Sequence, residues 1–336
     1  MSTSTLRERL QPALVDFVWR QWVQMGVFGT AARGDTWAQD PEALLVFSLA
    51  VARRDPRLFD ELLDWLRRNR RLISTRRIGT MIAADNPNRP LLEATLEWAA
   101  ENGVRRRLPS RPPTGEPQPL FPGLRVSKPD DIFFAHGFLK PAAEPSHKSG
   151  TPDLAAPINF AFRLREHFGL SSSRAEVVRF LLTMSAPDAN VATVARAAGF
   201  SKRNVNETLA ALTAAGSIRR VTRGNEGRYS IDRTRWAAFL NGSEDDLPVY
   251  RDWPQLLPAL HQIDRWLDNP EIDDLTDYMR ASEARSLMVE VAPLLANAGI
   301  PPPRDRDGAE YWSSFEETAD RLLEQLHPDA NGVRQR

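Results

Sequence analysis

Ten polar side chains between residues 201 and 228 have the chemistry needed to contact nucleic acid. On a helix predicted over residues 201–214, arginine could donate two hydrogen bonds to guanine, asparagine could pair with adenine, and glutamate could accept from cytosine. The arginine-rich stretch that follows has the positive charge that phosphate oxygens and the minor groove attract. The candidate contacts are Ser201, Lys202, Arg203, Asn204, Asn206, Glu207, Arg219, Arg220, Arg223 and Arg228.

Two short helices joined by a tight turn must position these side chains. Apolar residues recur at helical spacing at Val191, Val194 and Ala198 in the first helix, and at Val205, Leu209 and Leu212 in the second. Gly199 can adopt the backbone conformation of a tight turn, and Phe200 fills the corner beneath it. Ser201 is a typical N-cap. The pattern therefore predicts a helix, a turn and a second helix whose polar face is exposed.

This arrangement resembles the winged helix-turn-helix family, MarR-like or ArsR-like, over residues 170–240. The resemblance rests on Ala195, Gly199 and Val205, which match the small residue, glycine and branched apolar residue at the spacing of that family's motif. It implies that residues 201–214 form a recognition helix in the major groove and that residues 218–231 form a wing on the backbone or in the minor groove. A homodimer, with a preceding helix helping to dimerise, is also implied by the family.

Flanking residues extend this prediction. Ser173 can cap a scaffold helix that carries Val177, Phe180 and Leu181. Residues 218–222 and 228–231 suit short strands, joined by a reversal that contains Gly224, Asn225 and Gly227.

Some alternatives stay open at this point. Winged helices also serve as protein-binding modules, so DNA is not the sole partner that fits. Glu207 could read a base, or it could pair with an arginine or remain solvated. Arg67, Arg68, Arg70 and Arg71, with Arg76 and Arg77 close behind, could form a solvated helix end or an accessory phosphate contact.

Charge is distributed unevenly along the 336 residues, although the formal net charge is zero. After residue 241 the chain has 20 Asp and Glu against 9 Lys and Arg, a net of −11, so the preceding part carries +11. A basic front and centre suit nucleic acid, whereas an acidic tail suits a protein partner. The absence of cysteine and of a long apolar run predicts a cytoplasmic protein without membrane spans, and the amino-acid usage suggests a bacterial source.

Helical periodicity and proline content predict a mainly α, multi-domain protein whose central domain bears a small antiparallel β-wing. The predicted segments are an N-terminal helical domain over 1–104, a proline-rich connector over 105–157, the winged domain over 158–240 and an acidic helical domain over 241–336. The apolar residues 131–139 inside the connector are expected to pack onto a neighbouring domain, so that the connector is strapped down.

Motifs of enzymes are missing from the sequence. It contains no phosphate-binding glycine loop, no HExxH and no GxSxG, and its five histidines lack the spacing of metal ligands. Asp273, Asp274 and Asp277 lack the glycine-turned loop of a calcium site. We therefore expect no enzyme activity, no catalytic residues, no cofactor and no metal.

The sequence favours a transcriptional regulator that binds specific duplex DNA. The alternative is the antitoxin and autorepressor of a toxin–antitoxin pair, because the whole chain resembles regulator-antitoxins of the abortive-infection type. That resemblance implies a nucleotidyltransferase-type toxin as the partner, bound by the acidic C-terminal domain.

Overall fold

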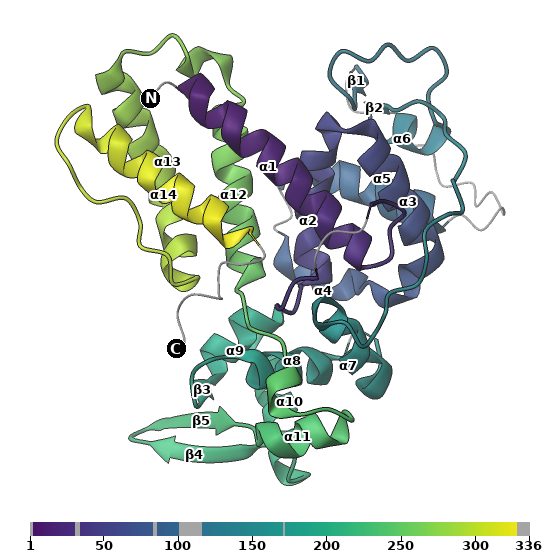
Figure 1. Cartoon of the computed structure of the whole chain (residues 1–336), viewed down its shortest axis with the longest axis vertical. Coiled ribbons are helices and arrows are strands. Elements are labelled where there is room, and N and C mark those ends of the chain that lie inside the picture. The colour runs from purple at the N-terminus through teal and green to yellow at the C-terminus, as the bar shows by residue number, and fades with distance from the viewer. Residues whose placement is uncertain (1–2, 31–33, 83–85, 101–115, 171, 328–336) are drawn as a thin grey trace. The chain divides into compact units, whose positions relative to one another are not determined.

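The chain is mainly helical and carries a small antiparallel sheet, as the sequence predicts (Figure 1). The computed structural model describes residues 3–30, 34–82, 86–100, 116–170 and 172–327. These residues form two compact units. One unit contains the chain up to Arg20 together with everything from Asp252 onward, and the other runs from Gln21 to Arg251.

The first unit combines the start of the chain with its acidic end. It contains most of α1 (Thr3–Gln24), with α12 (Trp253–Leu267), α13 (Asp277–Asn297) and α14 (Glu310–Gln325). Leu6, Leu10 and Leu14 recur every four residues along α1 and are fully buried. Phe17 lies against Trp253, with the ring centroids 5.4 Å apart. Helix α1 therefore contributes an apolar stripe to the core of the C-terminal helices.

This grouping differs from the four consecutive segments that the sequence predicted. The first 20 residues of the predicted N-terminal domain belong to the first unit instead. Their apolar stripe packs against helices that lie more than 230 residues further along the chain. The described parts of the predicted front domain, connector and winged domain belong to one unit. Its end is at Arg251, beyond the predicted boundary at 240, because the Val249 N–H donates to the Thr36 carbonyl at 2.9 Å.

Four helices form the front of the second unit: α2 (Pro41–Val51), α3 (Pro56–Asn69), α4 (Thr75–Met81) and α5 (Arg89–Ala100). In the sequence, Asp40 precedes Pro41 and Asp55 precedes Pro56, a pattern that predicts two N-caps, and both are confirmed. Asp40 accepts from the Ala43 N–H, and Asp55 accepts from the N–H groups of Arg57 and Leu58. The aliphatic neighbours of six aromatic residues in the sequence predict that these residues form a core: Trp19, Trp22, Phe47, Phe59, Trp65 and Trp98. All of them are buried except Trp19, which is half-buried.

The proline-rich stretch is anchored to these helices. Asp64 of α3 accepts from the Ser146 hydroxyl at 3.1 Å and from the N–H groups of His147 and Ser149 at 3.0 and 3.2 Å. The predicted packing of residues 131–139 is confirmed at Phe133, whose ring centroid lies 5.7 Å from that of Phe59 in α3, while residues 105–115 lie outside the described part. Despite its prolines the stretch also has regular structure: β1 (Gln118–Pro119) pairs in parallel with β2 (Phe138–Leu139), and α6 (Asp131–Ala135) lies between them in sequence.

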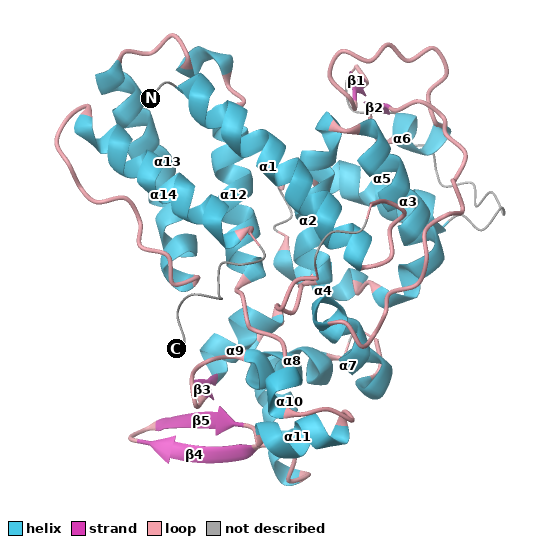
Figure 2. Cartoon of the chain, in the orientation of Figure 1, coloured by secondary structure: helices cyan, strands magenta, loops and turns pink. Residues whose placement is uncertain are grey.

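The rest of the second unit runs as helix, helix, strand, helix, helix, hairpin and helix. The elements are α7 (Phe160–Phe168), α8 (Ser173–Thr183), β3 (Ala189–Asn190), α9 (Val191–Ala198), α10 (Lys202–Ala214), β4 (Arg219–Arg223), β5 (Glu226–Ser230) and α11 (Arg233–Phe239). The three strands form one antiparallel sheet with β5 in the middle (Figure 2). Val194, Leu209 and Tyr229 are buried in one core, so the helices and the sheet pack as a single body.

Local details of this region differ from the sequence prediction. The N-cap of α8 is Ser172, whose hydroxyl accepts from the Arg174 N–H at 3.2 Å. Ser173 is therefore the first helical residue, and its hydroxyl lies 2.6 Å from that of Thr208. Strand β3 was not predicted, because two residues are too short to show an alternating pattern.

Six charged side chains are buried together between the front helices and α7–α9. They are three arginines and three carboxylates, each at most 4% exposed: Asp40, Glu42, Arg77, Arg165, Glu176 and Arg179. The open prediction that Arg77 belongs to a solvated or phosphate-binding run is wrong, because its side chain is fully buried. The neighbouring Arg68, Arg70, Arg71 and Arg76 are exposed, which fits a solvated helix end and an accessory phosphate contact alike.

These six side chains, which we call the charge cluster, connect helices that are far apart in sequence. Arg165 of α7 bridges Glu42 and Glu176, with its Nη2 2.6 and 2.7 Å from their oxygens. Arg77 of α4 donates to the same Glu42 at 2.7 Å, and Arg179 donates to Glu176 at 2.8 Å. The cluster therefore links α2, α4, α7 and α8 with hydrogen-bonded ion pairs.

The arginines of the charge cluster also lower the pKa values of two of its buried carboxyl groups. Burial would by itself raise the pKa of the Asp40 carboxyl, but the charges of Arg77 and Arg179 outweigh it and hold that pKa below its usual value. The pKa of Glu176 is likewise lowered, because the charges of the arginines, Arg165 first, exceed the opposing effect of burial. Both carboxylates stay ionised in the folded state.

We expect acid to destabilise the second unit through these groups. A carboxyl whose pKa is lower in the folded state contributes stability that is complete above its ordinary pKa, 4.5 for Glu176, and lost as the pH falls below it. The free energy of unfolding, measured with urea, should fall below about pH 4.5, and Glu176→Gln should make this dependence shallower. The exposed Glu290→Gln should keep the slope of the unmodified chain. Equal slopes in all three would contradict this assignment.

A second expectation concerns the composition of the first unit. Phe17→Ala removes a buried ring that faces Trp253, so it should cost about 3–5 kcal/mol of unfolding free energy and speed amide exchange in α12. The side chain of Val289, in the same unit, is 77% exposed. Val289→Ala should therefore change the unfolding free energy by less than about 0.5 kcal/mol. Unchanged exchange in α12 after Phe17→Ala would show that α1 does not belong to this core.

Candidate nucleic-acid interface

Helix α10 has one buried face and one exposed face. Val205, Leu209 and Leu212 are buried, as predicted. Ser201 is confirmed as the N-cap, since its hydroxyl accepts from the Asn204 N–H at 3.3 Å. The cap and the buried stripe together fix which side of the helix meets solvent.

Four of the predicted contact residues gather on the exposed face: Lys202, Arg203, Asn206 and Glu207. Arg203 Nε donates to Glu207 at 3.1 Å, one helical turn away, so the structure shows the pairing alternative for Glu207. The two side chains are 90% and 66% exposed. An ion pair so exposed contributes little free energy, which leaves both groups available to an incoming ligand.

The side chain of Asn204 is less exposed than those of the other predicted contact residues on α10. Its side chain is half-buried, and its Oδ1 is buried without a hydrogen-bond donor among the residues that the structure describes. The oxygen that would accept from an adenine is therefore not on the exposed face. Of the side chains predicted on α10, Asn204 is the one that the structure does not bring to the surface as expected.

Strand β4 is exposed over its whole length and carries Arg219, Arg220 and Arg223. The guanidinium of Arg220 reaches across to β5 over Gly227. A Cβ built on Gly227 would lie 2.9 Å from Arg220 Nε, closer than carbon and nitrogen approach in proteins. Glycine at this position thus makes room for the Arg220 side chain.

Asp188, just before β3, holds two of the predicted contact residues. Arg228 Nε lies 2.5 Å from its carboxylate and Arg223 Nη2 lies 3.1 Å from it. The hydrogen bond to Asp188 raises the pKa of the Arg228 guanidinium. Arg228 is 29% exposed and also contacts Glu226, so its first partner is the protein itself. The sequence analysis missed Asp188, because its partners are 35 and 40 residues away and no local pattern connects them.

Positive charge remains on this surface after the ion pairs are considered. Arg219 lies 3.6 Å from Asp232, a long and exposed contact. Lys202 and Arg220 have no acidic partner within 4 Å in the described parts of the chain. Exposed, unpaired cations therefore lie in the first turn of α10 and in the middle of β4.

Helix α10 and the hairpin are held by the same core. Ile218, at the start of the hairpin, and Tyr229 of β5 are buried in the cluster that also contains Leu209. Trp236 Nε1 of α11 donates to the Ser217 carbonyl at 3.0 Å and fixes the segment between α10 and β4. The exposed faces of α10 and β4 therefore keep a fixed relation to each other.

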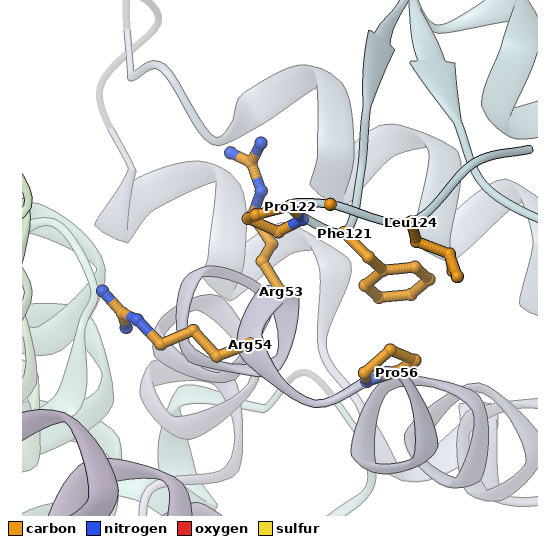
Figure 3. Close-up of a pocket in the computed structure, with 7 residues that line it drawn as sticks. Arg53, Arg54, Pro56, Phe121, Pro122 and Leu124 are labelled. Carbon is orange, nitrogen blue, oxygen red and sulfur yellow. The ribbon is translucent and has the colours of Figure 1, made fainter.

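A pocket of about 480 Å³ lies elsewhere in this unit, between the start of α3 and the loop after β1. It is lined by Arg53, Arg54, Pro56, Phe121, Pro122, Gly123 and Leu124. Figure 3 shows the guanidinium groups of both arginines pointing away from the rings of Phe121 and Pro56. The polar groups do not converge on the apolar wall, so the pocket lacks the arrangement of a ligand site.

The described residues also bear on metal binding and on membrane insertion. No group of three or more His, Asp or Glu side chains is placed to hold a metal ion there. None of the helices in those parts combines the length and the apolar composition that crossing a bilayer requires.

Comparisons of the chain with protein-family models, with curated proteins and with solved structures find no match. Interpretation of the interface therefore depends on its own geometry and charge.

Proposed function

We propose that this chain binds specific duplex DNA and regulates transcription. In this proposal α10 enters the major groove, and the hairpin of β4 and β5 lies on the backbone or in the minor groove. One observation carries the proposal: base-reading side chains share the exposed face of a helix that a common core joins to an arginine-rich hairpin.

The chemistry of α10 suits base readout. Arg203 can donate two hydrogen bonds to guanine, Asn206 can pair with adenine, and Glu207 can accept from cytosine once its pair with Arg203 opens. Ala210, exposed on the same helix, leaves space for close approach to the groove floor. Lys202 adds a cation at the helix start, where phosphate binds well.

The order of elements supports the family assignment proposed here. A helix, a short strand, two helices joined at Gly199, and a hairpin whose second strand pairs with the short strand follow one another in the order that a winged helix-turn-helix requires. A homodimer would place two copies of α10 on a two-fold symmetric site.

A second candidate function is favoured by the surface of α13. This helix of the acidic unit exposes Tyr278, Met279 and Val289, which are 69%, 52% and 77% exposed. Exposed apolar side chains on a helix of an acidic unit suit a protein partner. The chain would then be the autorepressing antitoxin of a nucleotidyltransferase-type toxin. A gene for such an enzyme beside this one, and co-purification of the two products, would favour this candidate.

The test of the proposed function is enrichment of duplexes from a random-sequence library by the full chain. Arg203→Ala should weaken binding to the enriched duplex by ~1–3 kcal/mol and relax the preference at one base pair, because it removes a bidentate donor. Fluorescence anisotropy on the enriched and a random duplex measures both effects. An equal loss on the two duplexes would make Arg203 a phosphate contact, and no enrichment by the unmodified chain would contradict the proposal.

Two arginines of the hairpin provide a matched pair. Arg220→Ala should reduce the salt dependence of binding by roughly one unit and leave the melting temperature unchanged, because it removes an unpaired, exposed cation. Arg228→Ala should instead lower the melting temperature, because it leaves Asp188 without its closest partner. Salt titrations and thermal melts of both variants separate the roles. The reverse pattern would show that Arg228 is the phosphate contact.

A further inference from the structure

The turn between α9 and α10 is held from outside the helix-turn-helix. Arg77, on helix α4, donates from Nε to the carbonyl of Ala198, the last residue of α9, at 2.7 Å. Arg179 of α8 reaches the preceding carbonyl, that of Ala197, at 3.4 Å. Two arginines of the charge cluster thus meet carbonyls that the end of a helix leaves without intrahelical partners.

Gly199 follows these carbonyls and packs directly on the same guanidinium. Its φ of +68° and ψ of 36° are left-handed, which favours glycine. A Cβ built there would also lie 3.0 Å from Arg77 Nε and 3.2 Å from Met81 Cγ. The turn therefore packs closely against α4.

Arg77 itself is held in one place. Its Nη1 donates to Asp40 at 2.6 Å and to Glu42 at 2.7 Å, and its Nη2 donates to Asp40. Because all its nitrogens are engaged and its side chain is fully buried, the guanidinium has no alternative position within the cluster. The location of the turn is thus set by α2 and α4.

We propose that Arg77 is a positioning residue for DNA recognition, which fixes where α10 begins and so how its first turn meets the bases. The proposal rests on the function proposed above. The cap Ser201 and the first-turn residues Lys202 and Arg203 come two to four positions after Gly199, so a displaced turn moves them directly. Helix α4 then acts on specificity without touching DNA.

Arg165 provides a matched control. It is buried like Arg77, at 4% exposed, and it also donates to two carboxylates of the cluster and to one backbone carbonyl, that of Leu72 at 2.7 Å. No bond of Arg165 in the described residues reaches α9, Gly199 or α10. Arg77→Lys and Arg165→Lys therefore disturb the cluster alike, while Arg77→Lys alone releases the turn.

The experiment uses the full chain, with the duplex enriched by the unmodified protein and a random duplex as probes, well below each variant's melting temperature. Both variants should melt at lower temperature. Arg77→Lys should lower the ratio of affinities for the enriched and the random duplex about tenfold, whereas Arg165→Lys should keep it. Amide exchange at Gly199 and Phe200, whose N–H groups donate to the Ala195 carbonyl, should become faster in Arg77→Lys alone.

Ratios that fall equally in the two variants, or in neither, would overturn the proposal. If Arg77→Lys does not fold, Met81→Ala trims the other contact of Gly199 on α4 and should lower the ratio in the same direction. An unmodified chain that enriches no duplex would overturn the proposed function and with it the role of Arg77 in recognition. In that case the exchange measurement still decides separately whether Arg77 holds the turn.

Discussion

The architecture of the second unit depends on the buried pairing of three arginines with three carboxylates. A single ionised group in a protein interior costs several kcal/mol of desolvation, so none of the six could be buried alone. Together they are electrically neutral, and each arginine donates to more than one acceptor. Removal of one member would leave an uncompensated charge in a medium of low polarity. The cluster therefore forms only when α2, α4, α7 and α8 pack in one arrangement. An apolar contact of the same size would not require a single arrangement of these helices.

The fixed geometry of the charge cluster explains why the front helices and the helix-turn-helix segment are one unit. Glu42 lies just inside α2, yet it accepts from Arg165, 123 residues later in the chain. Apolar surfaces can slide past each other at small cost, whereas these hydrogen-bonded pairs have a defined geometry. The unit that holds the exposed helix α10 thus includes helices from outside the predicted winged domain. A helix that reads bases benefits from such rigidity, because misplaced donors lose the angles on which discrimination depends.

Local features of the fold could be predicted from the sequence, and long-range features could not. The caps Asp40, Asp55 and Ser201 and the stripe of Val205 and Leu209 follow from spacing within one helix, and the structure has them where expected. The buried position of Arg77, the hydrogen bond from Arg228 to Asp188 and the packing of α1 against Trp253 all depend on partners at least 35 residues away. A single sequence shows the charges of such residues but not their pairing. Arginine in particular looks the same in a solvated run and in a buried cluster.

The charge of the surface formed by α10 and the hairpin bears on the sequence specificity that we propose for it. Several of its arginines already have acidic partners: Arg203 with Glu207, and Arg223 and Arg228 with Asp188. A fully basic surface would bind any duplex through its phosphates, and the attraction would be independent of sequence. Internal pairing lowers that general attraction, while a groove that offers a good acceptor to Arg203 and a donor to Glu207 can replace their weak exposed pair. Under the proposed function, partial neutralisation of the surface favours discrimination between sequences over affinity for DNA in general.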